Sequence, residues 1–218
     1  MSAAETLEAW SRIDAWLARH APGYRAHLNA PVVAEELRQA ERQLGVVFSP
    51  DLTAWWSRMN GLAPDARSGA PSYQGHLLPE YNDPYPLAQV LERRALHLEA
   101  VGETVPPSLA DQLAAWLTRC GEDPAGTLYP DEASAVWLPQ WLPLAGDGMG
   151  GGLFTDLRPG ELHGCVVRFT RTGHAAEPEW TSVAGMLTFV ADALSDVAPD
   201  NGDLGDGTHI GRWPVPRG

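Results

Sequence analysis

Residues 137–169 read WLPQWLPLAGDGMGGGLFTDLRPGELHGCVVRF, and this stretch decides the fold class. The run at 136–144 predicts an extended segment, and the glycine-rich run at 146–152 predicts a turn. Two further strands are predicted over 153–157 and 165–170, the second of them apolar and β-branched. The residues before this stretch predict helices. Helices first and strands later indicate an α+β fold, not alternating βαβ units.

The first half of the chain has helical periodicity. Apolar residues three and four apart predict helices over about 4–19, from Pro31 to Leu44, from Ser49 to an Asn60-Gly61 stop, and over 86–102. Gly45 is the expected residue after the second helix, because glycine adopts the left-handed conformation without strain. Ser108 and Ser182 are expected to cap two later helices.

Composition and charge restrict the function classes. The chain has 218 residues, enough for one sizeable domain, and 28 acidic residues against 15 arginines give a formal charge of −13. A surface this acidic repels the phosphate groups of nucleic acids and of anionic lipids. We therefore expect neither nucleic acid nor membrane as a partner. Residues 121–218 carry 14 acidic residues and 5 arginines. This imbalance favours a basic partner or serves solubility only.

The location and chemistry follow from what the sequence lacks. There is no signal-peptide pattern and no long apolar run, and Cys120 and Cys165 form no C-x-x-C motif. A reducing cytoplasm is the expected location. G-x-S-x-G, H-E-x-x-H and Walker motifs are absent, so we expect no catalytic residues, no metal and no cofactor. The alternative is a metal-dependent small-molecule enzyme that uses Asp147, Asp156 and His163.

The nine tryptophans are unusual, and four of them form two close pairs. Adjacent Trp55 and Trp56 on a helix point about 100° apart, so one is expected in the core and one near the surface. Trp137 and Trp141 share a face if the segment is extended, and the nearby prolines predict an edge or irregular strand. These rings either fill a wide core contact or anchor a partner.

Several motifs in order resemble one family. AERQLG at 40–45, FSPDL at 48–52 and WWSRMNG at 55–61 resemble the opening of the SMI1/KNR4 family, also called the SUKH superfamily. The stretch quoted first resembles the second half of the family's pattern, and the resemblance covers about 30–197. Two departures are Gly151-Gly152, where the family usually has an acidic or amide residue, and Val183, where it has an aromatic.

The resemblance implies a single α+β domain with a mixed sheet and helices packed around it. We therefore expect an N-terminal helical extension over 1–29, the SMI1/KNR4-like domain over 30–197 and a turn-rich segment over 198–218. It also implies a non-catalytic protein-binding module. Bacterial members resemble immunity proteins that neutralise a cognate toxin, and fungal members regulate cell-wall synthesis by binding other proteins. We therefore expect an immunity protein, with a cell-wall synthesis regulator or scaffold as the alternative within the family. No family residues transfer as a site, so the candidate partner-binding residues are inferred from the sequence: Trp55, Trp56, Trp137, Trp141, Asp147, Glu177 and Glu179.

Overall fold

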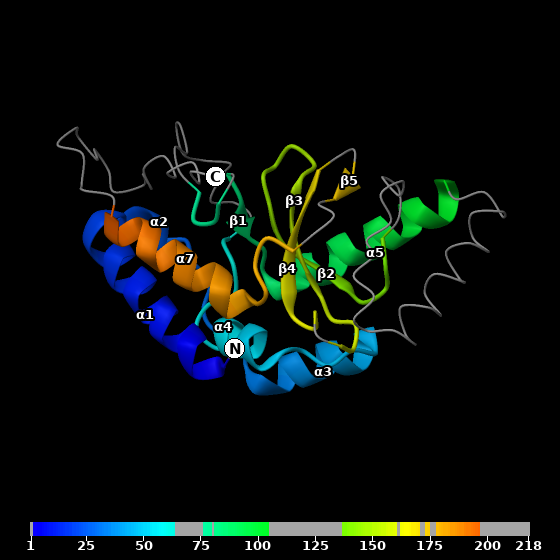
Figure 1. Ribbon diagram of the computed structural model, residues 1–218, viewed down its shortest axis with the longest axis horizontal. Helices are drawn as coiled ribbons and strands as arrows, with labels where there is room; N and C mark the ends of the chain where they lie inside the picture. The colour runs from blue at the N-terminus through cyan, green and yellow to red at the C-terminus, as the bar shows by residue number, and fades with distance from the viewer. Residues whose placement is uncertain are drawn as a thin grey trace.

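The structure is a computed structural model, in which an antiparallel sheet is packed between helices (Figure 1). The residues that it describes are 2–63, 76–79, 81–104, 137–160, 162–170, 173–174 and 178–196. The helix expected after Ser108 and the segment 198–218 lie outside them. Helices come first and most strands later, which confirms the α+β fold.

The N-terminal helix α1, Ala3–His20, confirms the predicted helix over 4–19. Ser2 and Glu5 form a capping box, in which each side chain accepts a hydrogen bond from the other's backbone amide. The buried face of α1 includes Trp10, Ile13 and Leu17 and packs against α7, Val183–Asp196, and against α4, Pro50–Trp56. A short helix that the sequence did not predict, α2, follows at Pro22–Ala26.

The next two helices differ from their predicted bounds. Helix α3, Ala34–Leu44, begins three residues after Pro31 and ends at Gly45, which has φ 66° as expected. Helix α4 ends at Trp56, before the predicted stop. Gly61 is left-handed, at φ 65°, but Asn60 is not; its side chain instead accepts a hydrogen bond from the Leu87 amide at 2.7 Å. Asn60 therefore caps the start of α5, Leu87–Thr104, because the first amides of a helix lack partners within it.

The sheet has the strand order β1-β2-β3-β4-β5. Its strands are β1 Asp83–Pro84, β2 Trp141–Gly146, β3 Gly152–Asp156, β4 Cys165–Thr170 and β5 Gly173–His174. Every pairing among the described strands is antiparallel, so in this part of the chain the expected mixed sheet is wrong. From β2 to β5, antiparallel pairing follows from the short connections, because a parallel pair needs a long crossover. The strands β1 and β2 are also antiparallel, although a long segment that includes α5 joins them.

The sequence predicted an edge or irregular strand here. Strand β2 is irregular, but it is not at the edge of the sheet. It lies between β1 and β3, and its register shifts between Pro143 and Ala145. Residues 137–140 form a turn rather than an extended strand, and the Trp141 amide donates to Leu138 O. The absence of an amide hydrogen on Pro143 accounts for an interrupted ladder here.

Alternation along the strands divides the core between the two faces of the sheet. Leu142, Leu153 and Val166 face the cluster formed with α1, α4 and α7. Their neighbours Trp141, Phe154 and Val167 face a second cluster, which is mainly aromatic; α5, which packs on β2, adds Leu98 to it. Within the described part of the chain, no helix is long and apolar enough to span a membrane.

Candidate functional site

The candidate site lies where two turns meet at one end of the sheet. Pairing sets Asp83 of β1 opposite Gly146 of β2, so the turn before β1 and the hairpin after β2 leave the sheet side by side. Both lie at the upper end of the sheet in Figure 1, away from α3 and α4. We call the described residues of 76–85 and 146–151 the turn surface.

A buried carboxylate holds the first turn in place. Asp83 is 3% exposed, and it accepts a hydrogen bond from the hydroxyl of Tyr24 in α2 at 2.8 Å. Its other oxygen lies 2.9 Å from Nδ1 of His76. The side-chain amide of Asn82 donates to Pro79 O at 2.8 Å within the same turn. Because a buried carboxylate without partners is strongly unfavourable, this network fixes the turn against the sheet and α2.

Tyr81 occupies the outer end of this turn. It has φ 66° and is the one non-glycine residue with a positive φ among those described. Its ring lies edge-on to His76, with centroids 5.7 Å apart, and the residue is 66% exposed. A left-handed tyrosine costs about 1–2 kcal/mol, so the surrounding hydrogen bonds must hold it there. The result is a large aromatic side chain presented to solvent on a fixed backbone.

The β2–β3 hairpin presents a second large apolar side chain at the same end of the sheet. Asp147 Oδ1 accepts hydrogen bonds from the amides of Met149 at 2.6 Å and Gly151 at 3.0 Å, which closes the turn. Gly148 and Gly150 have positive φ values of 73° and 102°. Met149 is 79% exposed at the tip. The carboxylate of Asp147 therefore shapes the hairpin that carries Met149.

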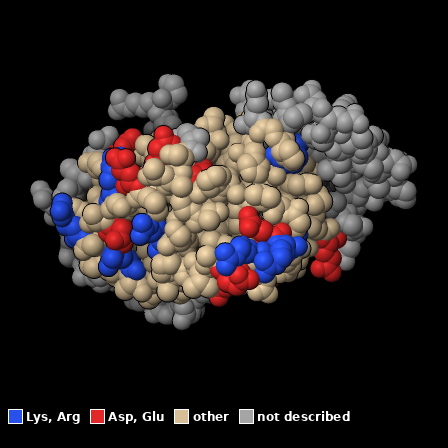
Figure 2. Space-filling model, turned by 90° about the horizontal axis from the view of Figure 1, so that it is seen from below, with Lys and Arg blue, Asp and Glu red and all other residues tan. Residues whose placement is uncertain are grey.

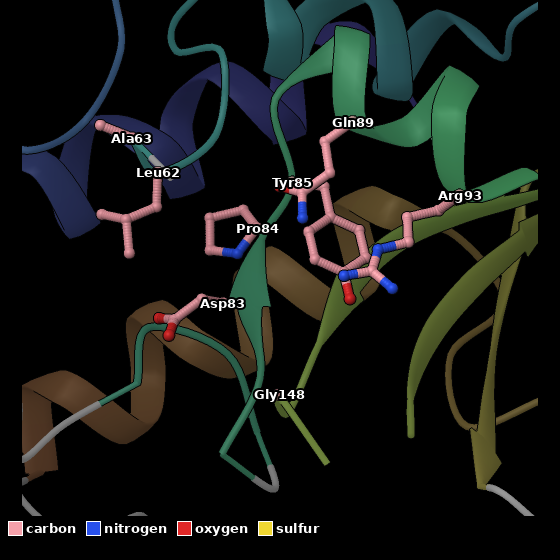
Figure 3. A pocket seen from close by; sticks show the side chains of 8 residues that line it. All are labelled: Leu62, Ala63, Asp83, Pro84, Tyr85, Gln89, Arg93 and Gly148. Atoms are coloured by element: carbon pink, nitrogen blue, oxygen red, sulfur yellow. The ribbon is translucent and has the colours of Figure 1, made fainter. Parts of the chain in front are cut away.

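A pocket of about 220 Å³ opens on the turn surface (Figure 3). Its walls come from the residues after α4, from β1, from α5 and from the hairpin: Leu62, Ala63, Asp83, Pro84, Tyr85, Gln89, Arg93 and Gly148. The Tyr85 hydroxyl packs directly on Gly146, where an added Cβ would overlap it. In Figure 3 the Arg93 guanidinium reaches from α5 to the Tyr85 ring, and Asp83 lies at the opposite end of the pocket.

The four tryptophans that the sequence suggested as anchors are core residues. Trp55 and Trp56 are 1% and 2% exposed, so the expectation that one of them lies near the surface is wrong. Both are buried because α4 is covered on two sides, by α1 and by Phe48, whose ring lies 5.1 Å from that of Trp56. Trp137 and Trp141 are buried in the aromatic cluster, where the Trp137 Nε1–H donates to Trp141 O. Side chains so buried offer no contact area to a partner in this structure.

The sequence segments that resemble the family contain residues that hold the fold together. Gly45 ends α3, Asp51 links α4 to α7, and Gly61 packs on the backbone of Tyr85 and Pro86. A sequence profile of the SMI1/KNR4 family (SUKH-1) matches residues 31–197, most of the chain. The chain belongs to the SMI1/KNR4 family. No curated protein matches it.

The N-terminal helix lies outside the segment that matches the SMI1/KNR4 family, yet it is part of the same core. Ile13 and Leu17 of α1 are fully buried in one cluster with Val183 and Leu187 of α7. In this chain, α7 is therefore covered by a helix that precedes the matched segment.

The two predicted acidic candidates near the end of the SMI1/KNR4 segment have different outcomes. Glu177 lies outside the described residues. Glu179 is exposed and lies beside β4, where its amide donates to Val166 O at 3.0 Å and its carboxylate lies 3.6 Å from the Arg168 guanidinium.

The residues of the metal-dependent alternative do not come together. Asp156 ends β3, whereas Asp147 lies in the hairpin before the strand begins, so at least the length of the strand, about 13 Å, separates them. Asp156 is 1% exposed and forms a forked ion pair with Arg158, and His163 Nδ1 lies 3.3 Å from Arg158 O. Among the described residues, no three histidine, cysteine or acidic side chains lie close enough to hold a metal ion.

Tyr81, Met149 and Arg93 were not predicted as site residues from the sequence. Tyr81 stands between Pro79 and Pro84, and Met149 stands in a glycine run, so both lie in recognisable turns. A large apolar residue in a predicted turn was the available signal, because turns lie at the surface.

Proposed function

We propose that this chain is a non-catalytic protein-binding module that acts as a bacterial immunity protein, with the turn surface as its binding site. The observation that carries the proposal is the pair Tyr81 and Met149, both largely exposed on rigid turns beside a pocket. Aromatic and methionine side chains are enriched where proteins bind one another. Membership of the SMI1/KNR4 family supports this function, since bacterial members resemble immunity proteins.

The proposed partner is a basic toxin domain. The formal charge of −13 would attract such a partner over a distance. The described residues account for less than half of this net charge, with 16 acidic residues against 10 arginines. Acidic and basic side chains interleave on the face seen in Figure 2, and Glu35 on α3, for example, pairs with Arg38 and Arg42. We therefore assign two roles to different parts of the chain: its net negative charge attracts the basic partner over a distance, and the turn surface forms the contact.

Protection from a toxin tests the proposal. The chain is produced in cells together with each toxin encoded beside its own gene, and survival is counted. Binding of the purified pair is then measured by calorimetry. Changing Tyr81→Ala and Met149→Ser together should weaken binding by about 1,000-fold, because buried interface anchors contribute roughly 2 kcal/mol each. Lost protection should accompany the lost binding.

Val47 provides the matched control. Its exposed fraction, 71%, is similar to the 79% of Met149, but Val47 lies between α3 and α4, away from the turn surface. Val47→Ser should leave protection and affinity unchanged. Protection that survives the loss of both Tyr81 and Met149 would show that the partner binds elsewhere. An association rate that does not fall with added salt would contradict the proposed electrostatic attraction, including any contribution of Glu177 and Glu179.

A further inference from the structure

Arg93 is the basic residue of the pocket, and it has no acidic partner among the described residues. Its guanidinium lies over the face of Tyr85, with the central carbon 5.9 Å from the ring centroid. No ion pair or hydrogen bond of Arg93 exists with any described residue. The next residue, Arg94, differs: its Nε and Nη2 both donate to Pro139 O, at 2.8 and 2.6 Å. Stacking on an aromatic face leaves the edge of a guanidinium free to donate hydrogen bonds.

The other residues that line the pocket lie around the free edge of the Arg93 guanidinium. Gln89 lies one helical turn before Arg93 on α5, so both side chains line the same pocket. Leu62, Ala63 and Pro84 supply apolar walls. The acidic group, Asp83, lies at the far end, and its two oxygens already accept from Tyr24 and face His76 (Figure 3). The acceptors of Asp83 are therefore already in use, whereas the donors on the edge of the Arg93 guanidinium face the pocket without a partner among the described residues.

The positive charge of Arg93 also acts on its surroundings. His97, one turn further along α5, has a pKa below its ordinary value, mainly because burial disfavours its charged form and also because Arg93 is near. The charge of Arg93 therefore acts beyond the pocket, along α5 to His97.

We propose that the pocket receives an aspartate or glutamate side chain from a loop of the protein partner and that Arg93 is the residue that selects it. The planar guanidinium matches a carboxylate through two parallel hydrogen bonds, and the apolar walls take the methylene groups. A basic partner overall is compatible with one acidic side chain at the contact, since charge attraction at a distance and pairing at contact are different effects. The inference rests on the proposed function, because it names what the turn surface recognises.

A displayed library of constrained nine-residue loops tests this without the natural partner. Loops are selected for binding to the full-length wild-type protein and, in parallel, to Arg93→Glu. Wild type should enrich loops with Asp or Glu at one shared position. Arg93→Glu should bind those loops about tenfold more weakly or worse, as measured by fluorescence anisotropy, and should itself enrich Lys or Arg at that position. Arg93→Lys should fall between, because it keeps the charge and loses the fork.

Arg58→Glu is the control. Arg58 is exposed, pairs with no described acid and lines a separate polar groove beside α1. Arg58→Glu should select the same loops as wild type, and thermal melts of all variants should show that they fold. Loops without a shared acidic position would overturn the inference. So would equal losses for Arg93→Glu and Arg58→Glu, which indicate general charge attraction. The outcome is independent of toxin protection, so failure of the inference is distinguishable from failure of the proposed function.

Discussion

Asp51 at the start of α4 accepts a hydrogen bond from the amide of Ala184 in the first turn of α7, at 3.1 Å, although the two residues are 133 positions apart. Its other carboxylate oxygen accepts from the Leu52 amide at 3.0 Å. Asp51 is 3% exposed. One buried carboxylate thus lies against the N-terminal ends of two helices, where free amides and the helix dipoles favour negative charge.

Replacing Asp51 should therefore destabilise the whole fold. Asp51→Ala leaves the Ala184 amide buried without its acceptor, and we expect the free energy of unfolding to fall by about 2–3 kcal/mol. Asp51→Asn keeps one acceptor and should lose less. Urea denaturation measures both. Asp192, which pairs with Arg12 at an exposed site, is the control, and Asp192→Ala should cost less than about 1 kcal/mol. Equal losses at the two sites would contradict a linking role for Asp51.

Two glycines with the same backbone conformation allow the cost of backbone strain to be measured separately from the cost of steric overlap. Gly45 and Gly61 have φ values of 66° and 65°, but a Cβ on Gly45 would meet nothing within 4 Å, whereas one on Gly61 would overlap the backbone of Tyr85 and Pro86. Gly45→Ala should cost about 1–2 kcal/mol from conformation alone. Gly61→Ala should cost at least about 1–3 kcal/mol more, because the chain segments must move apart. Similar melting temperatures for the two variants would be inconsistent with this packing.

The packing of α1 against α7 predicts that the N-terminal helix is required for stability. Ile13 is fully buried in the cluster that it forms with α7, so Ile13→Ala should lower the free energy of unfolding by about 2–5 kcal/mol. Leu96 on α5 is 49% exposed, and Leu96→Ala should change stability by less than about 0.5 kcal/mol. Deletion of 2–30 should expose the apolar face of α7 and abolish cooperative unfolding. A truncated chain that melts as sharply as the full one would refute this role.

His97 should make stability depend on pH. Its ring stacks on Trp137 with centroids 4.0 Å apart, and burial together with Arg93 lowers its pKa. The unfolded chain then binds a proton more readily, so stability is complete above the unfolded pKa of about 6.5 and falls as the pH drops below it. His97→Phe retains a stacked ring and should lose less stability between about pH 7.5 and pH 5.5.

The exposed His27 supplies the control for this measurement. His27→Phe should leave the acid-induced loss as it is in wild type. A second comparison tests the contribution of Arg93: Arg93→Gln removes the nearby positive charge and should raise the pKa of His97, as followed by NMR titration. An unchanged His97 titration would show that burial alone lowers this pKa.

The sequence was sufficient to predict elements that depend on near neighbours. The strand Cys165–Thr170, the left-handed Gly45 and the cap at Ser182, which accepts from the Gly185 amide at 3.0 Å, are all as expected. Each depends on side-chain alternation or on hydrogen bonds within about four residues, and that information is continuous in the chain.

The same local reasoning was wrong for Trp55 and Trp56. Their directions about the helix differ as expected, but α4 is enclosed on more than one side, so both directions lead into the core. Helical period predicts where a side chain points. It does not predict what lies there.

By itself, therefore, the sequence determined the fold class, most helix and strand positions, and the SMI1/KNR4 motifs, because these follow from short-range periodicity, caps and turns. Only the tertiary structure decided which residues form the candidate site. Tyr81 and Met149 lie in turns at the same end of the sheet because β1 pairs Asp83 with Gly146, and Arg93 reaches the pocket because α5 packs on β2. Exposure and pairing between distant residues are properties of the packed chain, since each depends on what the remaining elements cover.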